Sequence, residues 1–154
     1  MAAAEPKLYP NILSLIGDTP LLRLNSVASG LSGTLVGKME MLNPGGSVND
    51  RIGFRMLEEA ERRGWLRPGG TIVAPTSGNT GVGLAMAAAV RGYRCVFVMP
   101  DKVASEKVAL LRAYGAEVVT TPANVARESP DSYYSVADRL TQEIAGAFQP
   151  NQYF

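Results

Sequence analysis

Histidine is absent from this 154-residue sequence. Without it, Ser-His and Cys-His catalysis, histidine-based zinc sites and a histidine-ligated haem are excluded. The remaining residues form no other cluster typical of a metal site. We therefore expect neither a haem nor a structural or catalytic metal.

Cysteine is almost absent as well, since Cys95 is the single one. An intrachain disulfide is therefore impossible, which favours a reducing compartment. Cys95 stands in the apolar run CVFVM, with no base or positive charge beside it. We expect a buried, inert thiol and no nucleophile.

An excess of charge and a long apolar run are also lacking. Fifteen basic and 14 acidic residues give a net charge of +1, without a basic block. This balance indicates no nucleic-acid partner. The sequence has no run near the roughly 20 apolar residues of a membrane span and no leader pattern at its start, so we expect no membrane partner and a cytoplasmic location.

Apolar residues make up 46% of the chain, enough for one sizeable core and hence one domain. Strand-like runs alternate with helix-like patterns, which predicts a three-layer α/β fold with a mostly parallel sheet and flanking helices. The expected strands are 21–24, 35–39, 71–73, 95–99 and 117–120. An irregular loop is expected at 122–129.

Helical periodicity fills most of the intervals between these strands. One expected helix covers 82–90, and Ser129 is expected to cap another that begins at Pro130. The apolar faces expected to be buried are, in chain order, Ile52, Met56, Leu57 and Ala60; Val108, Leu111 and Tyr114; and Tyr133, Val136, Ala137, Leu140 and Ile144.

The turn from Thr76 to Gly81, TSGNTG, is the most informative stretch. It lies between an expected strand and an expected helix, so its hydroxyls, its amide and its backbone N–H groups stand at the positive end of a helix dipole. Such a site suits a carboxylate or a phosphate. The alternative is a structural connection, in which glycine supplies backbone freedom and Thr or Asn caps the helix.

A second glycine turn, NPGGSVNDR at residues 43–51, also opens a helix. Together with PTSGNTGVGLAMAAAVRGYRCVFVMPDK, SEKVALLRAYGAEVV and SYYSVADRL, it makes residues 12–154 resemble the cysteine synthase and cystathionine β-synthase family of pyridoxal-phosphate enzymes. The resemblance implies a small amino-acid substrate and, for a full-length member, a homodimer.

The resemblance also implies roles for individual residues. Asn79 matches a position that hydrogen-bonds the ring hydroxyl of the cofactor, and Gln152 matches a carboxylate-binding glutamine. An exposed loop amide is the alternative for Gln152. The positions that match the loop for the substrate carboxylate are Thr76, Ser77, Gly78 and Thr80.

One departure from the family pattern matters most: Asn49 stands where the family has its Schiff-base lysine. A carboxamide nitrogen is not nucleophilic, so it neither forms an imine nor shuttles a proton as an amine does. We expect turnover by the family mechanism to fail. Lys38 lies on an expected strand as a solvated or interface side chain, so we expect no rescue by it. Asp50 and Arg51 are expected to be a helix cap and a surface charge.

Two hypotheses follow. The first is the amino-terminal portion of a β-replacement enzyme, which replaces the β-substituent of serine or O-acetylserine with a thiol such as homocysteine or sulfide. SYYSVADRL and GAFQPNQYF favour cystathionine β-synthase over cysteine synthase. Residues 1–40 then cross to a larger domain, absent here with its cofactor-phosphate loop, and 41–148 form a smaller substrate-binding domain. The second hypothesis is a non-catalytic amino-acid-binding module.

Overall fold

The computed structural model describes residues 7–152, and its centre is a parallel sheet. The sheet has the strand order β5-β4-β3-β6. In chain order these strands are β3 (Thr71–Pro75), β4 (Arg94–Pro100), β5 (Glu117–Thr121) and β6 (Ala147–Phe148). Thr71 pairs with Arg94 on one side and with Ala147 on the other. The carboxyl ends of β3, β4 and β5 therefore meet at one edge of the sheet.

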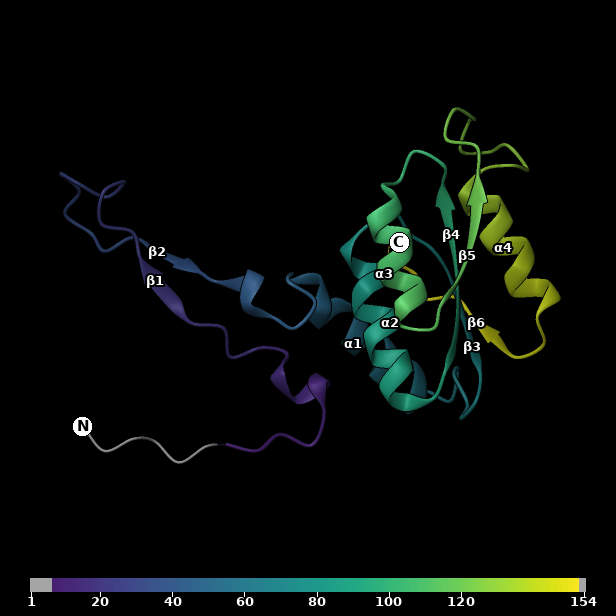
Figure 1. Ribbon diagram of the computed structural model, residues 1–154, viewed down its shortest axis with the longest axis horizontal. Coiled ribbons are helices and arrows are strands. Elements are labelled where there is room, and N and C mark those ends of the chain that lie inside the picture. Colours follow the sequence, from purple (N-terminus) through teal and green to yellow (C-terminus); the bar gives the residue numbers. More distant parts are fainter. Residues whose placement is uncertain (1–6, 153–154) are drawn as a thin grey trace.

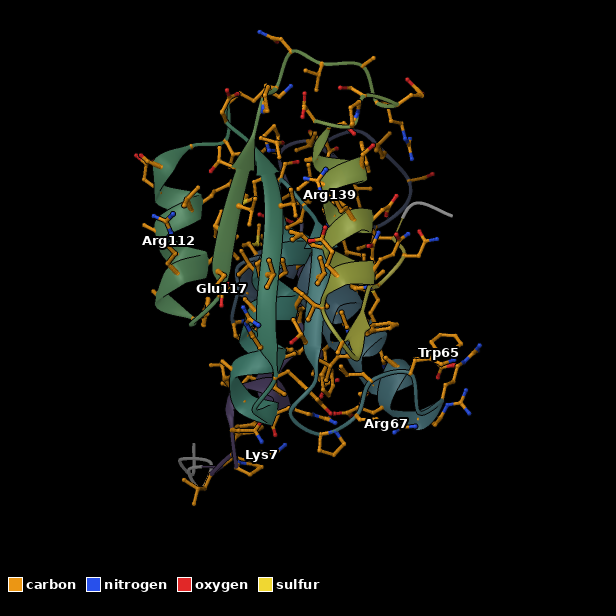
Figure 2. The ribbon with its side chains drawn as sticks, turned by 90° about the vertical axis from the view of Figure 1, so that its right-hand side faces the viewer. Lys7, Trp65, Arg67, Arg112, Glu117 and Arg139 are labelled. Carbon is orange, nitrogen blue, oxygen red and sulfur yellow. The ribbon has the colours of Figure 1, made fainter. Side chains whose placement is uncertain are left out.

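Helices cover both faces of this sheet (Figure 1). On one face lie α2 (Asn79–Arg91) and α3 (Ser105–Ala113), with α1 (Asn49–Arg62) packed on α2. The other face carries α4 (Tyr133–Glu143). Arg112 of α3 and Arg139 of α4 lie on opposite sides of the sheet (Figure 2). The expected three-layer α/β arrangement is confirmed.

The core follows the alternation of the central strands. Phe97 and Cys95 face α2 and α3, whereas Val96 and Val98 face α4. Burial raises the pKa of the Cys95 thiol to about 12. Cys95 is therefore the buried, unreactive thiol that its apolar surroundings predict.

The first two strands do not join the parallel sheet. β1 (Leu21–Arg23) and β2 (Val36–Lys38) pair antiparallel in a separate hairpin, which projects away from the layered body (Figure 1). Two short 3₁₀ helices, η1 (Ile12–Leu15) and η2 (Glu40–Leu42), flank it in the chain. Of the described helices, none is both long and apolar enough to cross a membrane.

The N-terminal segment is attached to α1 through Glu40. The Arg51 guanidinium forms a two-pronged ion pair with the Glu40 carboxylate, with both N···O distances 2.9 Å. Thr19 and Asn43 also donate hydrogen bonds to Glu40, at 2.6 and 2.8 Å. These partners, Arg51 foremost, lower the pKa of Glu40 to about 2. Arg51 is thus a partner in an ordered network, and the expectation of a plain surface charge is wrong.

Two expectations about the helices are also wrong. Ile52 remains 41% exposed, and the buried face of α1 contains Asp50, Gly53, Leu57 and Ala60. Ser129 does not cap α4, which begins at Tyr133 with Ser132 as its cap. The Ser132 hydroxyl accepts from Ser135 N–H at 3.1 Å and donates to the Arg127 carbonyl at 2.7 Å. This second bond anchors the cap to the preceding loop.

Helices α1 and α2 touch backbone to backbone at Gly53 and Gly83. A Cβ on Gly53 would lie 2.5 Å from both the Gly83 carbonyl carbon and the Leu84 nitrogen. These atoms are backbone, so the contact cannot be relieved by a rotamer change. The crossing therefore requires glycine at residue 53.

We expect Gly53→Ala to lower the free energy of unfolding by about 1–3 kcal/mol, the usual cost of overpacking. Alanine favours an isolated helix by up to about 1 kcal/mol over glycine, but here the helices must separate to admit its methyl group. Urea denaturation measures the difference. Gly33→Ala is the control, because no atom lies within 4 Å of a Cβ at that position. Equal stability of Gly53→Ala and the unsubstituted chain would contradict the close crossing.

Candidate functional site

The candidate site is the turn that joins β3 to α2. Thr76 continues the sheet, since its N–H donates to the Val98 carbonyl at 3.1 Å. Its side chain is buried, and a Cβ on Gly81 would lie 2.7 Å from Thr76 Cγ2. Thr76 therefore packs under the turn and fixes its shape, whereas Ser77 is exposed on the turn.

The N terminus of α2 has no side-chain cap within the described part of the chain. Its N-cap residue is Gly78, in an extended conformation with φ −142° and ψ −158°. The Thr or Asn cap of the purely structural alternative is therefore not observed. The first N–H groups of an α-helix lack partners inside the helix, so those of α2 are suited to bind an anion.

Two residues of the other glycine turn reach this helix start. The Asn49 carboxamide donates a hydrogen bond to the Thr80 hydroxyl oxygen, with an N···O distance of 2.9 Å. The Asn79 carboxamide donates to the Ser47 hydroxyl at 3.3 Å. The helix starts of α1 and α2 are thus linked through Asn49, Thr80, Ser47 and Asn79.

Gln152 lies near the same end of β3. Its side-chain amide donates to the Pro75 carbonyl at 3.3 Å. Of the residues predicted from sequence, Asn49, Asn79 and Thr80 are thus brought together around the start of α2. Ser77 and Gly78 lie in the turn before them, and Gln152 approaches the turn from the C-terminal end of the described chain.

Asp50 behaves differently from the helix cap that we expected. It is fully buried, and its carboxylate accepts the Gly45 N–H at an N···O distance of 2.6 Å. α1 has no side-chain cap hydrogen bond at its N-cap residue, Val48. Burial raises the pKa of Asp50, and the charge of Glu40 adds to that rise. The expectation of a helix cap is therefore wrong.

Sequence reasoning gave no role to Ser47, and it named Asp50 only as a helix cap. Both belong to the glycine turn of residues 43–51, which was singled out, but a serine and an aspartate beside glycine are common in any exposed turn. The position of Ser47 opposite Asn79, and the enclosure of Asp50 beside Gly83, depend on how α1 packs on α2. The sequence did offer one signal for them: it contains two glycine turns, at residues 43–51 and 76–81, and each opens a helix.

The family model described as "Pyridoxal-phosphate dependent enzyme" matches residues 12–154. Cystathionine beta-synthase of Oryctolagus cuniculus is 56% identical over 153 residues, which cover 98% of this chain and 28% of that protein. The probable cysteine synthase of Bacillus subtilis is 46% identical over 147 residues, with coverage of 96% and 46%. The chain thus spans less than half the length of these curated relatives.

Solved structures agree with the sequence relatives. A hydrogen sulfide-producing enzyme from Fusobacterium nucleatum has a TM-score of 0.86 and 37% identity, covering 96% of this chain and 47% of that one. An O-acetylserine dependent cystathionine beta-synthase from Helicobacter pylori has a TM-score of 0.84 and 32% identity, with coverage of 96% and 48%. The fold and the sequence together establish that this chain belongs to the family of pyridoxal-phosphate dependent enzymes that includes cystathionine β-synthase and cysteine synthase.

Proposed function

We propose that this chain forms the amino-acid-binding part of a β-replacement enzyme similar to cystathionine β-synthase. Serine or O-acetylserine is the proposed substrate, and a thiol such as homocysteine or sulfide the second one. Cysteine synthase activity is the closest alternative. The identity of 56% to the rabbit cystathionine β-synthase, against 46% to the Bacillus cysteine synthase, favours the first.

The observation that carries this proposal is the uncapped start of α2. Backbone N–H groups, the Thr80 hydroxyl and the Asn79 carboxamide meet there at the carboxyl end of β3. Ligands of parallel α/β sheets bind at this edge. In the proposed complex, Ser77, Asn79 and Thr80 lie nearest the carboxylate of the amino acid, and Gln152 adds a further amide. The buried Thr76 supports the turn from beneath.

Asn49 does not fit covalent attachment of pyridoxal phosphate. Its carboxamide has no nucleophilic nitrogen, and it already donates to Thr80. Asn79 could still contact the cofactor without a covalent bond. The proposed function of this chain is therefore amino-acid binding, without the β-replacement reaction of the family.

A non-catalytic amino-acid-binding module is the second candidate, and the contact between Asn49 and Thr80 favours it. The Thr80 oxygen accepts from Asn49, so its own hydrogen is left for a ligand. A carboxylate binds there with no need for an imine. The two candidates share the same anion site and differ in whether this chain is one part of a larger β-replacement enzyme or a module that binds an amino acid by itself.

We expect the chain to bind serine and O-acetylserine weakly, and Thr80→Ala to lower the affinity about tenfold or more. The lost hydrogen bond to a charged group is worth roughly 1.5–3 kcal/mol, and about 1.4 kcal/mol corresponds to a factor of ten. Titration followed by backbone amide shifts in NMR measures this. Thr80→Ser is the matched control, since it keeps the hydroxyl. If Thr80→Ala binds serine with unchanged affinity, or if the shifted amides lie far from residues 77–80, the turn does not bind the carboxylate. It is then only a structural connection.

The arrangement of the wider protein is also a proposal. Residues 41–148 would form the smaller, substrate-binding domain, and residues 1–40 would cross to a larger one. The projecting hairpin supports this division. A homodimer and a cytoplasmic location complete the proposal for the full-length protein.

A further inference from the structure

Asp50 is an unusual residue for the first turn of a helix. An acidic side chain there is normally solvated and interacts with the helix dipole. Here Asp50 is fully buried, and in residues 7–152 its Oδ1 has no hydrogen-bond partner, while Oδ2 accepts from Gly45. A buried carboxylate with an unpartnered oxygen is costly, so a group of this kind calls for an explanation.

The surrounding backbone leaves just enough room for this carboxyl group. A Cβ on Gly45 would lie 2.5 Å from Asp50 Oδ1 and 2.9 Å from Oδ2. From the other side, a Cβ on Gly83 of α2 would lie 3.1 Å from Asp50 Cα. Asp50 is therefore enclosed between the first glycine turn and α2, and substitution of either glycine would displace it.

Gly45 connects Asp50 to the candidate site. The turn is closed by Gly46 N–H, which donates to the Asn43 carbonyl at 2.8 Å. It leads directly to Ser47, whose hydroxyl accepts from the Asn49 N–H at 3.2 Å and from the Asn79 carboxamide at 3.3 Å. A contact that holds Gly45 in place therefore also sets the positions of Ser47 and Asn49 relative to α2.

We propose that Asp50 is a positioning residue, which holds the glycine turn through Gly45 so that Ser47 and Asn49 meet Asn79 and Thr80. It touches no ligand itself. Its effect on amino-acid binding rests on the proposed function, but its effect on the geometry of the turn does not.

The charges and the burial around Asp50 shift its pKa, and this shift gives a way to measure the role of Asp50. Desolvation and the charge of Glu40 raise the pKa of Asp50, and the Gly45 hydrogen bond lowers it. Arg51, next in the chain, is paired with Glu40, and on the side of α2 a Cβ on Gly83 would lie 3.1 Å from Asp50 Cα. Because the folded pKa is raised, the contribution of Asp50 to stability is complete below its ordinary pKa and is lost as pH rises through the folded value.

The test follows the Gly45 amide by NMR across pH, in the unsubstituted chain and in Asp50→Asn. We expect the Gly45 shift to titrate above the ordinary aspartate range, and to be flat in Asp50→Asn. Asp50→Asn keeps an acceptor for Gly45 and should keep serine affinity within about twofold. Asp131→Asn, at an exposed loop position, is the matched control and should leave the Gly45 titration unchanged.

Asp50→Ala removes the acceptor. We expect the Ser47 and Asn79 amides to shift without ligand, and serine affinity to fall about tenfold. If Asp50→Ala does not fold, the Gly45 titration in the unsubstituted chain and in Asp50→Asn still tests the positioning role. The positioning role would be overturned if the Gly45 amide shift does not follow the titration of Asp50. It would also be overturned if the Ser47 and Asn79 amide shifts are unchanged in Asp50→Ala. If the unsubstituted chain binds no serine but those amides still shift in Asp50→Ala, the proposed function fails and the positioning role stands.

Discussion

The 154-residue chain, mixed with pyridoxal phosphate and reduced with borohydride, is expected to carry no stoichiometric pyridoxyl adduct on any single residue. A carboxamide lone pair is delocalised, so Asn49 forms no imine for borohydride to reduce. Lys38 is not placed as a substitute, because its ammonium donates to the Thr19 carbonyl at 2.8 Å in the hairpin region. Peptide mass spectrometry after reduction measures the labelling.

Asn49→Lys is the matched comparison for this experiment. It restores a primary amine at the start of α1, so any site-specific label gained should map to residue 49. Turnover is not expected from this variant in a chain that spans less than half of its relatives. A stoichiometric adduct on Lys38 in the unsubstituted chain would overturn the prediction, since it would show that a lysine elsewhere in the chain takes the place of the missing one at position 49.

Self-association of the isolated chain is the second large effect that we expect. The hairpin stands away from the body (Figure 1). It exposes large apolar side chains such as Leu21, which is 63% exposed, and Leu42 of the following helix η2 is 62% exposed. Two-stranded hairpins are marginal alone, and exposed strand edges pair with other chains. Large exposed apolar patches mark interfaces or aggregation sites. Sedimentation velocity over a range of concentrations measures the expected dimers or larger species.

Charged substitutions in the hairpin region test where association occurs. Leu21→Lys with Leu42→Lys should shift the distribution toward monomer, because lysine opposes edge-to-edge pairing and removes apolar surface. Leu110→Lys, at an exposed leucine of α3, should not. A cooperatively folding monomer in the unsubstituted chain would contradict the prediction. It would also favour the independent binding module over a piece of a two-domain enzyme.

Local pattern was sufficient for much of the layered fold. The parallel strands β3, β4 and β5 are apolar runs that the sequence predicts, whereas the two-residue strand β6 was not expected. Helix α3 buries Leu111 with Val108 and Tyr114 packed beside it, as expected. The stripe of α4 is confirmed too, with Val136 and Ala137 buried and Leu140 packed on them. In these elements the apolar side chains themselves mark the face that packs, so periodicity alone locates it.

Hydrophobic periodicity did not predict the buried face of α1, where small residues make the closest contacts. On α1 the side chains with the strongest hydrophobic signal include Ile52, which is exposed, whereas Gly53 lies at the contact with α2. Glycine contributes no hydrophobic signal, and its value here is the absence of a Cβ. The same contact encloses Asp50, a residue that composition assigns to the surface.

The sequence by itself determined the chemistry at position 49, because an asparagine lacks a nucleophilic amine in any fold. It also determined the strand, glycine turn and helix start at residues 76–81, since these are local features. Only the tertiary structure decided that Asn49 meets Thr80, 31 positions along the chain, and that Asp50 is enclosed against Gly45. Such contacts depend on how closely α1 approaches α2, which backbone packing at Gly53 and Gly83 sets and no local pattern records.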